Sequence, residues 1–211
     1  MFQNLGRLDT LALTGHISLP QNMQKLNNLQ LLVDARSINP WQGLHDLLQN
    51  VRYARNIDLT LIAIHSTEIF TTFSEYHISK LTLLNSDFKF LNNNSLTSLT
   101  MMKSLTMYVN KVSIHKEAFH AMKSLTELIL FYGPSLICRK GSFYGLYNLK
   151  HLTIMQRSVR SISSFFEHTK RKCLHQGIFL GLDNLKRLEL GGNPFICLKP
   201  GAFQGLYNTE E

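Results

Sequence analysis

Apolar residues recur along this chain with a rhythm that neither one helix nor one strand keeps. In the stretch Phe143–Arg157 the steps between apolar positions are three, three, three and then two, and the last step is the spacing of a strand. Two other stretches repeat it, with apolar residues at Phe119, Met122, Leu125, Leu128 and Leu130 and at Phe179, Leu182, Leu185, Leu188 and Leu190. The chain is therefore built from internal repeats.

The period of these repeats predicts the fold. Counted from the first apolar residue of each L-x-L core, the cores begin at Leu11, Leu32, Ile57, Leu81, Leu105, Leu128, Leu152 and Leu188. Six of the seven spacings lie between 21 and 25 residues and the seventh is 36, against about 20–29 residues for leucine-rich repeats. We predict an α/β leucine-rich repeat solenoid, a curved horseshoe with a parallel β-sheet on its concave side and irregular loops or short helices on its convex side.

We expect residues 1–211 to form a single repeat array, with about eight repeats and a ninth that begins at Phe203 and is cut short. The second repeat has two alternative phases, because Asp34 would occupy an apolar position; Leu31 and Val33 are the alternative inward pair. The stretch Trp41–Arg55 predicts a helix, since its apolar residues share one helical face. These residues are Leu44, Leu47, Leu48 and Val51.

The long seventh spacing predicts an insertion. About twelve additional residues fall between Ser163 and Gln176, and this segment contains Lys170, Arg171 and Lys172. A long insertion in a regular array forms a loop on one face, which is often the binding face. We therefore predict a loop at 163–176.

The charge of the chain is uneven. The net charge is +8 overall, of which +1 falls in residues 1–105 and +7 in residues 106–211. A basic half attracts phosphates, acidic glycans or an acidic protein surface, although a solvated face that keeps the protein soluble gives the same composition. No apolar stretch reaches the length of a membrane span, and no signal peptide pattern is present. Neither end shows a cap, so we expect a fragment of a longer solenoid; the alternative is a short protein with unusual caps.

Phe-x-Gly-Leu units point to a family. They occur in GSFYGLYNL at 141–149, GIFLGLDNL at 177–185 and GAFQGLYN at 201–208, together with ELGGNPFICLKPGAF at 189–203. These units resemble extracellular leucine-rich repeats with a period of about 24 residues. The uneven period, the long insertion and an asparagine ladder kept only at Asn110 and Asn193 resemble a Toll-like receptor ectodomain.

The resemblance implies a non-catalytic, ligand-sensing segment of an innate immune receptor. It further implies a place in the extracellular space or the endosomal lumen, as part of a membrane receptor that dimerises when complete. The alternative is a stand-alone leucine-rich repeat module for protein–protein interaction, without signalling.

An apolar column is the first candidate site. Three residues after the start of four successive cores stand Leu84, Tyr108, Phe131 and Met155, with Tyr132 beside them. Neighbouring strands lie about 4.8 Å apart, so these side chains would stack on the concave surface. Exposed aromatic patches mark interaction sites, which predicts a protein or microbial ligand here. The alternative is that the following loop covers the column.

The inserted loop is the second candidate site. Lys170, Arg171 and Lys172 are suited to a polyanion or nucleic acid, which would bind in a strongly salt-dependent way. The resemblance is compatible with this, since some Toll-like receptors sense nucleic acid. The alternative is a solvated loop without a ligand.

Three cysteines occupy similar places in consecutive repeats. Cys138, Cys173 and Cys197 stand five, six and six residues before the next repeat's phenylalanine. This placement allows a disulfide between Cys138 and Cys173 or between Cys173 and Cys197, leaving one thiol; three buried thiols are the alternative.

Two further points follow from the residues. Asn93 begins the only N-x-S/T sequon without proline and is a glycosylation candidate if the chain is secreted. The motifs of metalloproteases, nucleotide-binding loops and serine hydrolases are absent. We therefore expect no enzyme activity, no metal and no cofactor.

Overall fold

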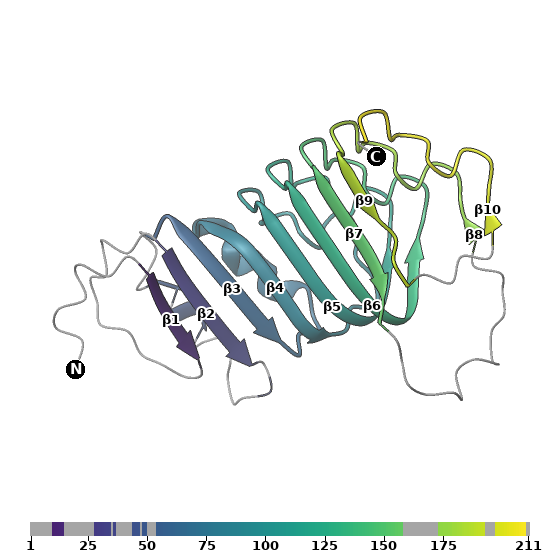
Figure 1. Ribbon diagram of the computed structural model, residues 1–211. Coiled ribbons are helices and arrows are strands. Elements are labelled where there is room, and N and C mark those ends of the chain that lie inside the picture. The colour runs from purple at the N-terminus through teal and green to yellow at the C-terminus, as the bar shows by residue number, and fades with distance from the viewer. Residues whose placement is uncertain are drawn as a thin grey trace.

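The structure is a computed structural model. It describes residues 10–14, 28–34, 36, 44–46, 48–49, 54–157, 173–192 and 197–209, with the strand at 10–14 described by its backbone alone. Figure 1 shows parallel strands laid side by side in chain order. The predicted solenoid of leucine-rich repeat type is confirmed.

Eight strands form the main sheet. They are β1 (Thr10–Thr14), β2 (Asn28–Asp34), β3 (Asn56–Ile62), β4 (Ile78–Ser86), β5 (Ser104–Ile114), β6 (Glu127–Cys138), β7 (His151–Gln156) and β9 (Arg187–Glu189). A second, two-stranded sheet pairs β8 (Cys173–Leu174) with β10 (Cys197–Leu198). All of these pairings are parallel, as expected when each repeat adds one strand.

Ring spacings show which side of the solenoid is concave. On the sheet, the rings of Tyr108 and Phe131 from neighbouring repeats are 4.7 Å apart. In the turns opposite the sheet, Phe119, Phe143, Phe179 and Phe203 stack at 6.0–6.2 Å per repeat. The closer spacing on the sheet side agrees with a sheet that lies on the concave side.

The strand register corrects three of the predicted core positions. The residues paired across the sheet are Leu13, Leu31, Leu59, Leu81, Leu105, Leu128, Leu152 and Leu188. Leu11 and Ile57 were therefore wrong by two residues and Leu32 by one. The alternative inward pair, Leu31 and Val33, is confirmed because both are buried.

An additional buried residue explains the error at Ile57. In β2 and β3 a third alternate position is buried, at Leu29 and at Ile57, so each strand has two overlapping L-x-L patterns. Any two of three alternating apolar residues then fit the repeat template equally well.

Helical turns occur on the side opposite the sheet. Residues 44–46 and 48–49 are helical, and Leu44 and Leu48 are buried, as predicted; Trp41, Leu47 and Val51 lie outside the described residues. The 3₁₀ helix η2 (Glu68–Glu75) buries Phe70 and Phe73, whose rings are 6.0 Å apart. No described helix is long and apolar enough to cross a membrane.

The Phe-x-Gly-Leu motif has a direct structural reason. Phe143 is fully buried between Phe119 and Phe179. Two residues later, Gly145 has a φ of +104°, and a Cβ there would lie 2.5 Å from the backbone Cα of His120 in the preceding repeat. Only glycine allows two turns to approach this closely.

Asparagine side chains join the same turns. The side-chain amides of Asn148, Asn184 and Asn208 donate to the backbone carbonyls of Lys123, Tyr147 and Asp183, each in the preceding repeat. They satisfy carbonyl groups that the turn geometry leaves without a backbone donor.

Candidate ligand-binding surface

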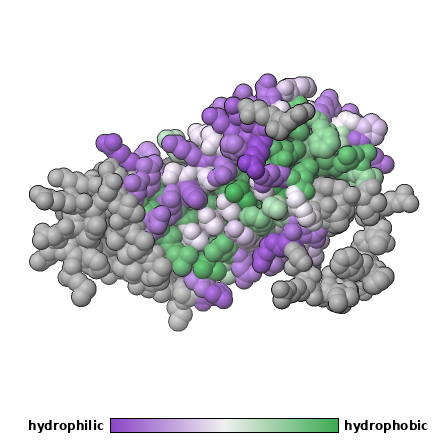
Figure 2. Space-filling view, viewed as in Figure 1, coloured by the Kyte–Doolittle hydropathy of each residue, from purple (hydrophilic) through white to green (hydrophobic). Residues whose placement is uncertain are grey.

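Three columns of side chains point outward from the main sheet. Side chains alternate across a strand, so the positions one before, one after and three after each core residue share the concave face. Figure 2 shows apolar surface interrupted by hydrophilic residues over the strands in this view. The third column contains Ile62, Leu84, Tyr108, Phe131 and Met155, all partly buried.

The strongest contact in this column is between two aromatic rings. Tyr108 and Phe131 are paired in register, and their rings stack with an interplanar angle of 17°. Phe131 is in turn paired with Met155 on β7. These three side chains form one apolar surface on rigid strands; we name Tyr108, Phe131 and Met155 the aromatic column.

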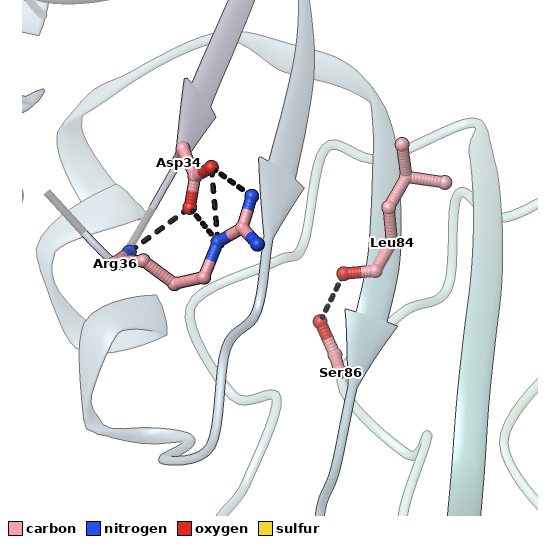
Figure 3. A network of polar contacts seen from close by, with 4 residues as sticks. All are labelled: Asp34, Arg36, Leu84 and Ser86. Atoms are coloured by element: carbon pink, nitrogen blue, oxygen red, sulfur yellow. Dashed lines mark hydrogen bonds and ion pairs between the residues drawn. The ribbon is translucent and has the colours of Figure 1, made fainter.

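Leu84 lies next to this column but out of register with it. The pairing of β4 with β5 shifts between Leu83 and Ser86, and Asn85 there has a φ of +49°. The hydroxyl of Ser86 donates to the carbonyl of Leu84 at 3.1 Å, as Figure 3 shows. Leu84 is instead in register with Ile62. The bulge thus separates Leu84 from the other three residues of the predicted stripe and leaves it paired with Ile62.

The N-terminal end of the third column is charged. Asp34, in register with Ile62, accepts hydrogen bonds from the backbone and side chain of Arg36, with Nε 2.9 Å from one carboxylate oxygen (Figure 3). The side-chain hydrogen bond from Arg36 lowers the pKa of Asp34 to about 2. This exposed pair ends the apolar surface.

The other two columns are polar. The central column is mostly threonine: Thr60, Thr82, Thr106 and Thr153, with Ile129 between the last two. In the first column, the hydroxyl of Ser104 donates to Glu127 at 2.7 Å. At the C-terminal end of the sheet, Arg187 and Glu189 form an ion pair at 2.6 Å.

The concave face differs in charge from the chain as a whole. Its outward positions hold four acidic residues, Asp34, Asp58, Glu127 and Glu189, and two basic ones, Lys80 and Arg187. The chain has a net charge of +8. The basic excess therefore lies off the concave sheet, and this face suits an apolar or cationic surface better than a polyanion.

Tyr132 does not belong to this surface. It is 3 % exposed and points into the core, and burial, with a smaller contribution from Cys138, raises its pKa to about 12. Its prediction as a ligand contact was wrong, because adjacent residues of a strand face opposite sides and Phe131 already points outward. Ile62 was not predicted as a member of the third column, because it stands three residues after Leu59 and the predicted core residue of that strand was Ile57.

The cysteines form one of the two predicted disulfides. Cys173 and Cys197 are bonded, with Cα atoms 4.6 Å apart, and they are paired in register between β8 and β10. Cys138 is free, and burial raises its pKa to about 12. Cys138 stands five residues before the next phenylalanine, whereas Cys173 and Cys197 stand six residues before theirs. This shift of one residue turns Cys138 to the inner face of its strand, so the spacing already favoured the Cys173–Cys197 pair.

The remaining predicted sites lie elsewhere. Asn93 is exposed in the segment between β4 and β5, and the hydroxyl of Ser95 lies 3.2 Å from a side-chain oxygen of Asn92. Lys170, Arg171 and Lys172 lie outside the described residues. Within the described parts of the chain, no three His, Cys, Asp or Glu residues are grouped as metal ligands.

Comparison with known proteins supports the fold and the class of module. No protein-family model matches the chain, and no curated protein sequence matches it. Among solved structures it is similar to the crystal structure of a TLR13–ssRNA13 complex, with a TM-score of 0.54 and 25 % sequence identity. The match covers 88 % of this chain and 28 % of that chain, so this chain spans little more than a quarter of the neighbour's length. The likeness to a Toll-like receptor supports a leucine-rich repeat module that binds a ligand.

Proposed function

We propose that this chain is the ligand-sensing segment of a Toll-like innate immune receptor and that it binds a protein partner through the aromatic column. The observation that supports this most is the stacked pair Tyr108–Phe131, half-buried on a concave sheet of low basic charge. Aromatic side chains on a rigid scaffold are the residues that most often dominate protein interfaces. The segment acts by binding, not by catalysis.

The disulfide supports the proposed location. Disulfides persist in oxidising compartments and are rare in the cytosol. The Cys173–Cys197 bond therefore agrees with an extracellular or endosomal place for the chain. There Asn93 would be available for glycosylation, and the complete receptor would form its dimer on the ligand.

The test compares two pairs of exposed aromatic residues. Immobilised chain is exposed to separated protein, lipid, polysaccharide and nucleic acid fractions of microbial extracts. The variant Tyr108→Ser/Phe131→Ser is compared with Tyr144→Ser/Tyr147→Ser, an exposed pair in a turn on the other side of the solenoid. We expect binding of the protein fraction to fall at least about tenfold in the first variant only, as for an interface hot spot. Unchanged protein binding by the first variant would refute the proposed site.

The inserted loop supports a second candidate function. The net charge of +7 in residues 106–211 and the ssRNA13 bound by the TLR13 neighbour favour a nucleic acid ligand. Replacing Lys170, Arg171 and Lys172 by glutamine should weaken the salt dependence of single-stranded RNA binding. The slope of log K against log salt concentration should become smaller by about two. An unaltered slope would exclude the loop as the RNA site.

A further inference from the structure

Basic residues form two adjacent rows directly after the C-terminal ends of β5, β6, β8 and β10, before the phenylalanine of each following turn. The row four residues before each phenylalanine contains His115, Arg139, His175 and Lys199, and the row three residues before it contains Lys116 and Lys140. We name these six residues the basic ridge. All are exposed except His115, which is partly buried.

Backbone pairing holds the ridge in register across four repeats. Ile114 is paired with Cys138 next to the first two repeats of the ridge, and Leu174 with Leu198 next to the last two. Between these pairs, the backbone N–H of Gly141 donates to the carbonyl of Gly177 at 2.9 Å. The phenylalanine rings of the same turns repeat every 6.0–6.2 Å, so the basic side chains recur at a regular spacing.

Glycines of the following repeat fix the lysine stems. A Cβ on Gly141 would lie 3.4 Å from Cγ of Lys116, and a Cβ on Gly177 would lie 3.1 Å from Cγ of Lys140. The aliphatic stems therefore lie against the next turn while the ammonium groups reach solvent. Side chains that are already ordered lose less entropy when they bind a ligand.

Few acidic groups oppose this charge. In each repeat we consider the two residues before and the two residues after the ridge positions. The single acidic residue among them is Glu117, which forms an ion pair with Lys116 at 3.1 Å. Arg139, Lys140 and Lys199 form no ion pair with any described residue. These three unneutralised cations, in the second and fourth repeats of the ridge, attract a linear polyanion.

We propose that the basic ridge binds a linear sulfated polysaccharide. A single-stranded nucleic acid would call for aromatic side chains on which successive bases stack. Among the ring contacts of the described residues, one involves a ridge residue: Phe90 stacks on His115, with ring centroids 5.8 Å apart, so this ring is already engaged. A chain of sulfate groups needs only the regularly spaced cations. This site is separate from the aromatic column and does not depend on the function proposed for it.

The experiment measures binding of a heparin oligosaccharide of defined length to the full chain by fluorescence anisotropy over a range of salt concentrations. Arg139→Gln/Lys140→Gln is compared with Lys80→Gln/Lys103→Gln, which removes the same charge from two exposed lysines away from the ridge. At low salt we expect the ridge variant to lose about tenfold in affinity and about two units of salt slope. We expect the control to lose less than about twofold, and thermal melting verifies that both variants are folded.

Two further ligands decide the class of polyanion. Chemically desulfated heparin should not bind, and oligouridylate of similar length should bind more weakly and without dependence on the ridge. The proposal is overturned if both variants lose affinity equally, if the wild-type chain does not bind heparin at physiological salt, or if oligouridylate binds as tightly as heparin and loses affinity in the ridge variant.

Discussion

The repeats of β1–β4 and those from β5 onward differ in how one repeat is held in phase with the next. From β5 to β7 the core residues are 23 and 24 residues apart, and the turns are joined by stacked phenylalanines, close glycines and asparagine amides. From β1 to β4 the spacings are 18, 28 and 22. There Phe70 packs at a tilt against Phe73 and Phe88 instead of extending a stack.

The turns, more than the strand leucines, therefore fix the phase of a repeat. Strand leucines are buried in both regions. Within the part of the chain that the structure describes, side chains in the turns contact the equivalent position of the next repeat in the C-terminal region alone. Among the described residues of the N-terminal region no such contact is present, and the positive φ values there fall on Ala63 and Asn85.

Loss of one stacked ring should have the largest effect. Phe143→Ala removes a fully buried ring that contacts rings of both neighbouring repeats, and we expect a loss of about 3–5 kcal/mol in the free energy of unfolding. Phe70→Ala should cost a similar amount. Hydrogen exchange separates the two: Phe143→Ala should lower protection on both sides of its repeat, in β6 and β7, whereas Phe70→Ala should affect β3 and β4. If the loss of protection extended over equally many neighbouring strands in both variants, the two regions would not differ in how their repeats are coupled.

Glycine substitutions test the turn contacts themselves. Gly145→Ala places a Cβ against the backbone of His120 at a positive φ, and we expect a loss of about 2–5 kcal/mol. Ala63→Gly is the matched change in the N-terminal region, where a non-glycine residue already has a φ of +59°. Glycine relieves the backbone strain of this positive φ, but the substitution also removes a buried methyl group. Because these two effects oppose each other, we expect the free energy of unfolding to change by less than about 1 kcal/mol. Chemical denaturation measures both, and a Gly145→Ala variant of wild-type stability would contradict the turn-contact explanation.

The sequence predicted the C-terminal repeats well for the same reason. Phe119, Phe143 and Phe179 give an unambiguous phase, and every predicted core residue from Leu81 onward is in register. In β2 and β3 three alternating apolar residues are buried, so the phase could not be chosen from the pattern alone.

The site was predictable to a similar extent. Tyr108, Phe131 and Met155 follow directly from the correct phase of their repeats, and they do lie on one face of the sheet. The separation of Leu84 could not be foreseen, because the bulge at Asn85 depends on hydrogen bonds between repeats. The basic ridge was not predicted, because its residues are far apart in the sequence and become neighbours only when the repeats stack.

Reduction of the disulfide should have a smaller effect, confined to the C-terminal region. Cys173 and Cys197 are 24 residues apart, and the chain-entropy model gives about 3 kcal/mol for a bond that closes such a loop. Cys173→Ser should therefore lower the stability of the repeats around β8–β10 and leave amide exchange in β2–β4 unchanged. Cys138→Ser controls for the loss of a sulfur without the loss of a bond. Destabilisation that extended to β2–β4 would mean that the two regions unfold as one unit.

A rise from pH 8 to pH 9.5 should produce the smallest effect, again from the C-terminal region. Burial raises the pKa of the Cys138 thiol to about 12, while an unfolded thiol has a pKa of about 8.5. Because the folded pKa is the higher one, the stability due to the neutral thiol is fully present below pH about 8.5 and is lost as pH rises toward 12. In this window the free energy of unfolding should fall by up to about 1.4 kcal/mol per pH unit. Cys138→Ala should postpone the fall until about pH 10, where Tyr132 begins to contribute because its own pKa is raised to about 12. Denaturation at pH 8 and pH 9.5 distinguishes the two chains, and an identical fall in both would show that Cys138 is not held as a neutral thiol in the core.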